Sequence, residues 1–182
     1  MNHLFKSILK AMLVVTGLAF LGCATTAAYF HTSTPASKTI ETQVFSASFE
    51  PLKNNSNFFS VFNLKITNKT DHILEIDWNK TVYFHNKKNL GNFVFKGITP
   101  SDVKARSVPN ETIQANASFS KKISPLSKIA LAQRKDLTAI NKESGLYAGL
   151  LPEGLNSILI AINNNGEIIK KTISVVIKEE EK

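Results

Sequence analysis

The segment that most constrains the fold is Phe58–Thr67. On this segment one set of residues, Phe58, Phe62, Leu64 and Ile66, alternates with a second set, Phe59, Val61, Asn63, Lys65 and Thr67. A period of two is the period of a β-strand that buries one of its faces. The chain is therefore expected to build a β-sheet with a hydrophobic side.

Similar short runs of β-branched and aromatic residues follow along the chain, separated by turn-forming residues. They predict strands at residues 44–50, 73–78, 82–85, 92–96, 113–123, 155–163 and 167–178. Asn164-Asn165-Gly166 predicts a tight hairpin between the last two, because Asn-Gly readily supplies the positive φ angles that such turns need. Residues 87–91 are expected to form a hairpin loop, and residues 97–110, which contain two prolines, an irregular connection.

One segment, residues 127–140, leaves two interpretations open. Its apolar residues fit a short helix that begins at Ser127, and they also fit a strand followed by a loop. We favour the short helix.

Seven or eight short strands with turn signals between them predict an all-β fold, an antiparallel β-sandwich. The long strand that ends in Ile66-Thr67-Asn68-Lys69-Thr70 resembles the immunoglobulin-like sandwich domains of bacterial lipoproteins. This resemblance covers residues 44–177, implies a fold and carries no functional residue across. The inter-sheet disulfide of antibody domains cannot form, because the chain has a single cysteine.

The N-terminal segment has the layout of an export signal. Lys6 and Lys10 form a short basic region, and Ala11–Gly22 is uncharged and mostly apolar. Small residues follow, and the single cysteine, Cys23, comes directly after Gly22.

This arrangement resembles the lipobox of bacterial lipoproteins. Gly22 and Cys23 match the pattern, whereas Phe20 and Leu21 replace its usual leucine and small residue. The resemblance implies cleavage between Gly22 and Cys23 and acylation of the Cys23 thiol with fatty acids such as palmitate. Several acyl chains are needed for stable anchoring, because a single chain binds a membrane only marginally. In lipoproteins that stay in the inner membrane, the residue after the cysteine is Asp, whereas this chain has Ala24. The resemblance therefore implies that, in a cell with two membranes, the protein is anchored in the outer membrane and faces the periplasm.

A second interpretation of the leader stays open. No charged residue lies between Ala11 and Phe30, and such a stretch is long enough to cross a bilayer as an uncleaved helix. We favour cleavage, because threonines lower the hydrophobicity of the second half of this stretch and no basic cluster follows it. The predicted organisation is a signal peptide (1–22), a flexible tether (23–42), a β-sandwich domain (43–178) and a charged tail (179–182).

Charge and composition narrow the possible partners. The formal net charge of +8 comes from scattered lysines, without a basic run or a nucleic-acid-binding motif. We therefore expect no nucleic-acid partner. For an exported basic domain we expect an envelope protein or polysaccharide as the partner.

Few residues suggest chemistry. His31 falls in the predicted tether, whereas His72 and His85 lie near strand ends and are too few to predict a metal site. We expect no cofactor, no metal and no catalytic residue. The function that we favour is a membrane-anchored binding or structural module of the cell envelope. The alternative is a hydrolase of envelope polymers, with Asp77, His85 and Glu111 as candidate acid–base groups.

Overall fold

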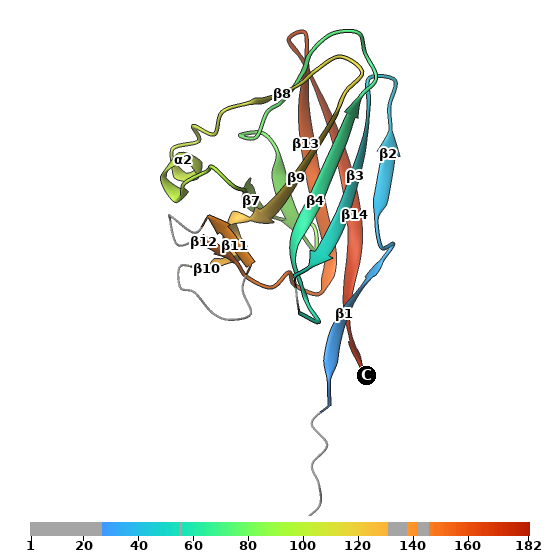
Figure 1. Cartoon of the computed structure of the whole chain (residues 1–182), viewed down its shortest axis with the longest axis vertical. Helices are drawn as coiled ribbons and strands as arrows, with labels where there is room; N and C mark the ends of the chain where they lie inside the picture. Colours follow the sequence, from blue (N-terminus) through green and yellow to red (C-terminus); the bar gives the residue numbers. More distant parts are fainter. Residues whose placement is uncertain (1–26, 55, 131–137, 142–145) are drawn as a thin grey trace, which may run out of the picture.

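The computed structural model describes residues 27–54, 56–130, 138–141 and 146–182, and these form a β-protein (Figure 1). All the strand pairs in this part of the chain are antiparallel. The all-β prediction is confirmed.

Four strands form one side of the fold, in the order β9-β4-β3-β2. Their bounds are β2 Lys38–Glu41, β3 Phe45–Lys53, β4 Phe59–Asn68 and β9 Ser118–Pro125. The predicted alternation is confirmed from Phe62 onwards, where Phe62, Leu64 and Ile66 are fully buried and the residues between them are not. From Phe59 to Phe62 every residue is buried, so that part of the strand is covered on both faces. This side therefore presents a continuous apolar surface to the interior.

The other side is built around the hairpin of β13 (Gly154–Asn164) and β14 (Glu167–Glu181). Its turn is the predicted one, with positive φ at Asn165 (51°) and Gly166 (93°). The neighbouring strands are β1 Tyr29–Thr34, β5 Leu74–Ile76, β6 Val82–His85, β7 Lys88–Val94 and β8 Glu111–Ile113. β1 pairs with β14, β5 and β6 pair with β13, and β8 pairs with β5.

The two sides belong to one curled sheet of eleven strands within the described part of the chain. β7 pairs with β6 and also, through Phe93 and Val94, with Pro125 and Ser124 of β9. The ends of the sheet, β1 and β2, are consecutive in the sequence and only residues 35–37 separate them. The chain therefore joins the two edges covalently.

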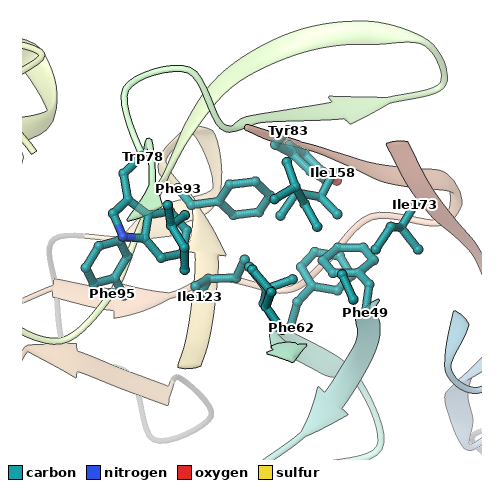
Figure 2. Packing of buried hydrophobic residues seen from close by; sticks show 14 of the residues in the cluster. Phe49, Phe62, Trp78, Tyr83, Phe93, Phe95, Ile123, Ile158 and Ile173 are labelled. Atoms are coloured by element: carbon teal, nitrogen blue, oxygen red, sulfur yellow. The ribbon is translucent and has the colours of Figure 1, made fainter. Parts of the chain in front are cut away.

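Aromatic rings fill the space between the two sides (Figure 2). The ring centroids of Phe49 and Phe62 are 4.2 Å apart, and Tyr83 lies across the core at 6.2 Å from Phe62. Trp78 packs on Phe95 at 4.5 Å. Large apolar side chains from both sides thus form the core without a disulfide.

The prediction of a flexible tether over residues 23–42 is wrong for the residues that the structure describes. β1 and β2 occupy most of residues 29–41, and β1 pairs along β14, with His31 opposite Glu179 and Tyr29 opposite Glu181. The same pairing orders the tail predicted to be frayed, since β14 continues to Glu181. The free edge of β14 supplies backbone partners that the local sequence does not reveal.

The helix predicted over residues 127–140 is also wrong where residues are described. A 3₁₀ turn at Leu126–Lys128 leads into β10 (Ile129–Ala130), and Thr138–Asn141 forms β11. Together with β12 (Leu146–Ala148) they make a small separate sheet. Residues 131–137 lie outside the described part.

A short helix lies instead in the predicted irregular connection. α2 (Pro100–Lys104) begins with a capping box, in which the side chains of Thr99 and Asp102 each accept a hydrogen bond from the other's backbone N–H. Pro100 favours the first helical turn, so it starts this helix rather than preventing one. The predicted loop at residues 87–91 is also displaced, because the turn falls at Asn86-Lys87 and β7 begins at Lys88.

Candidate binding surface

The outward side of β6, β13 and β14 is the most distinctive surface of the domain. On these strands the even positions of β6 and β14 and the odd positions of β13 point away from the core, and the pairing places them side by side. We call this surface the outer face. It consists of Val82, Phe84, Leu155, Ser157, Leu159, Thr172, Ser174 and Val176.

The outer face is apolar where an exposed sheet surface is usually polar. Its five apolar side chains are all half-buried and none belongs to the buried core. They are Val82, Phe84, Leu155, Leu159 and Val176. These side chains therefore lie outside the apolar core, which the opposite side of the same strands faces.

The outer face is also hollowed. A shallow cavity of about 280 Å³ is lined by Phe84, Lys87, Leu155, Ser157, Thr172 and Ser174. Within it the hydroxyls of Ser157 and Ser174 are hydrogen-bonded at 2.8 Å. The hollow thus combines apolar walls with a polar pair, the usual composition of a binding site.

The β6–β7 turn carries Lys87 to the hollow. Asn86 and Lys87 both have positive φ (47° and 67°), as a two-residue hairpin turn requires. Asn86 Oδ1 accepts a hydrogen bond from the backbone N–H of Leu155, and the backbone N–H of Asn86 donates to the Leu155 carbonyl, both at 2.9 Å. The turn is thereby fixed against the start of β13.

Lysines surround the outer face. Lys87 lines the hollow, and Lys170 and Lys178 are exposed at outward positions of β14. Two carboxylates lie towards opposite ends of the face: Glu75 accepts a hydrogen bond from Asn163 at 3.1 Å, and Glu180 accepts one from Thr32 at 3.0 Å. Glu153 is also exposed, just before the start of β13, so the charge at the hollow itself comes from Lys87 in its lining.

The opposite side of the fold provides a contrast. A shallow depression of about 170 Å³ on β2, β3 and β4 has only hydroxyl and lysine side chains in its lining, namely Thr39, Ser46, Ser48, Lys65 and Thr67. We call this the polar face. It has the composition expected of a solvated sheet surface.

The three candidate acid–base groups of the hydrolase hypothesis each have a partner in the fold. Asp77 forms an ion pair with Lys80 at 2.8 Å, and His85 Nε2 donates to the carbonyl of Glu153 at 2.6 Å. Glu111 accepts a hydrogen bond from Trp78 Nε1 at 2.9 Å.

The fold also keeps His85 away from the two carboxylates. His85 lies opposite Asn156 of β13, whereas β5, next to Asp77, meets β13 at Ile162. Asn156 and Ile162 are six residues apart on β13, a distance of about 20 Å along the strand. Within the described residues, moreover, no three His, Cys, Asp or Glu side chains are grouped as metal ligands.

His72 and His85 lie near strand ends as predicted, but His31 is placed differently from the prediction. His31, assigned to the tether, is buried, and its Nδ1 accepts a hydrogen bond from the N–H of Phe59 at 3.2 Å. Burial lowers the pKa of His31; Glu179 and Glu153 oppose this effect, and Lys53 adds to it.

His72 lies at the other end of the domain, between Asn164 (2.6 Å from Nε2) and Asp71 (3.1 Å from Nδ1). The hydrogen bond to Asn164 has the largest effect on the pKa of His72, and it and the hydrogen bond to Asp71 both raise this pKa. His72 is bonded to Asn164, whereas His85 is paired with Asn156. These two asparagines are eight residues apart on β13, so His72 and His85 do not meet.

Sequence reasoning did not identify the outer face. The only signal was that residues 158–162 are apolar at every position. This pattern predicts a strand with apolar side chains on both faces, but it does not show what covers either face. Cys23 and Gly22, the predicted lipidation and cleavage residues, lie outside the described residues. No helix in the described part is both long and apolar enough to span a membrane.

No known protein family, curated protein or solved structure matches the chain.

Proposed function

We propose that this protein is a lipid-anchored binding module of the bacterial cell envelope, held at the membrane through Cys23. The leader and Gly22-Cys23 support the anchor. The single observation that supports binding is the half-buried, hollowed apolar outer face. For the fold we propose an immunoglobulin-like sandwich, with β2-β3-β4-β9 as one layer and β6-β13-β14 as the other.

The position of the chain ends supports an anchoring role and limits its geometry. Lys182 N–H donates to the carbonyl of Ala28 at 2.8 Å, so the C-terminus and the entry of the leader lie together at one end of the domain (Figure 1). From Cys23 to Tyr29 the chain advances six residues, which reach at most about 20 Å. An acylated Cys23 would therefore hold the domain close to the lipid headgroups.

This geometry would turn the outer face sideways rather than towards the lipid. β13 and β14 lie along the long axis of the molecule, and β14 ends where β1 begins (Figure 1). The hollow would then be open to proteins beside the anchor. A short anchor of this kind also raises the local concentration of the domain for partners in the same membrane.

The anchor is tested by metabolic labelling with a fatty acid in a bacterial host. We expect the wild type to be labelled and processed to a shorter chain that begins at residue 23. Cys23→Ser should be unlabelled and should keep its leader. Cys23→Ala serves as a second variant that lacks the thiol. Equal labelling of wild type and both variants would reject the anchor, and an unlabelled wild type that keeps Met1 would point to an uncleaved span instead.

A further inference from the structure

We propose that the outer face docks an acidic protein segment that places an apolar side chain in the hollow between Phe84 and Leu155. The proposal deepens the binding role proposed above and depends on it for the cellular location. Three properties of the outer face support it, namely its shape, its polarity and its charge.

The shape of the face favours a protein segment over a lipid surface. The apolar side chains around the hollow are half-buried and form a depression rather than a projection. Side chains that insert into a bilayer must protrude. In the described part of the chain the large exposed hydrophobic residues, Tyr29, Ile73 and Leu150, are all elsewhere. A hollow of about 280 Å³ instead fits one inserted side chain and its flanking backbone.

The Ser157–Ser174 pair gives the hollow a polar contact. One of the two hydroxyl protons forms the bond between them, and the other can be donated to a carbonyl or carboxylate of the partner. A protein segment offers such acceptors next to its apolar side chains.

Charge favours an acidic partner over a second copy of this chain. In a two-fold symmetric dimer each partner presents the same surface, so the lysines around one hollow would meet those around the other. Lys87 and Lys170 are both exposed, and neither has an ion-pair partner within the described residues. Like charges facing each other disfavour that contact, whereas carboxylates on a different protein would be attracted.

The test is photo-crosslinking in the producing cells, with benzoylphenylalanine placed at residue 84, where it replaces an aromatic side chain. The matched control carries the same group at residue 48, on the polar face. We expect a protein adduct from position 84 at least tenfold stronger than from position 48. The crosslinked peptide of the partner should be rich in Asp and Glu and should contain an apolar residue at the site of attachment.

Charge reversal gives a second measurement. Lys87→Glu with Lys170→Glu should weaken the adduct from position 84 at least tenfold. Lys65→Glu with Lys122→Glu, the same change of net charge on the opposite side, should leave it unchanged. Thermal melting of each double variant shows whether the domain still folds.

Several outcomes would overturn the proposal. They are an adduct with lipid, an adduct with a second copy of the chain, equal adducts at both positions, no adduct at all, or an adduct that both charge reversals affect equally. Failure of the anchor is distinguishable. An unlabelled Cys23 together with an acidic adduct at position 84 would reject the anchor and keep the docking surface, and the converse would reject the docking surface alone.

Discussion

Asn86 and Leu155 hold two parts of the outer face together. The side-chain oxygen of Asn86 accepts from the Leu155 N–H and its backbone N–H donates to the Leu155 carbonyl, each at 2.9 Å. Gly154, directly before Leu155, has φ of +99°, and a Cβ there would lie 2.6 Å from Asn86 Oδ1. The position of Lys87 at the hollow therefore depends on residue 154 having no side chain.

Gly154→Ala should destabilise the domain more than Gly166→Ala. Both glycines have positive φ, and forcing alanine into that region costs about 1–2 kcal/mol. A Cβ at residue 166 meets nothing within 4 Å, whereas the one at 154 must displace the Asn86 amide and break a bond worth about 1 kcal/mol. Urea unfolding of both variants measures the difference.

Asn86→Gly provides a control for this interpretation. It removes the amide that the Cβ would strike, so adding Gly154→Ala to it should cost about as much as Gly166→Ala does in the wild type. Additive effects of the two substitutions would contradict a direct clash.

Tyr83→Phe should destabilise the domain although the ring is kept. The Tyr83 hydroxyl donates to Asn156 Oδ1 inside the core, where both residues are fully buried. Without that donor a buried acceptor is unsatisfied, at a cost of about 1–3 kcal/mol. Tyr29→Phe, at an exposed position, should change the unfolding free energy by less than about 0.5 kcal/mol. Equal losses in the two variants would contradict the role of the buried bond.

Protonation of His31 should weaken the domain. Burial lowers its pKa from 6.5, so the folded state binds this proton less readily than the unfolded state. The stabilisation is complete above about pH 6.5 and declines as the pH falls towards the lower folded pKa. His31→Gln keeps an acceptor for the Phe59 N–H but does not titrate. Urea unfolding between pH 7.5 and pH 5 should therefore depend less on pH in this variant, and an identical dependence would contradict the prediction.

The effect of His72 on stability should have the opposite pH dependence. Its hydrogen bonds to Asn164 and Asp71 raise its pKa above 6.5, so its contribution is present at low pH and is lost as the pH rises through the folded pKa. Histidine NMR signals should show His72 titrating above pH 6.5 and His31 below it. Asn164→Ala and Asp71→Asn should each lower the pKa of His72, because each removes a partner that raises it. An unchanged His72 titration in either variant would contradict this assignment.

Local patterns predicted several elements correctly because their causes are local. The alternation around Phe62 and Leu64 identified a strand with one buried side, and Asn165-Gly166 identified the hairpin because its positive φ angles depend on the residues themselves. The capping box at Thr99 and Asp102 was an equally local signal for α2, and it was missed because Pro100 was interpreted only as a helix breaker.

An all-β domain whose sheet has a hydrophobic side could be predicted from the sequence alone, because periodicity and turn residues act over a few positions. The pairing of β1 with β14, the burial of His31 and the meeting of Phe84, Leu155 and Val176 in one outer face could not be predicted in this way. These features depend on which strands become neighbours. Strand pairing joins residues far apart in the chain through backbone hydrogen bonds, which any residue except proline can donate.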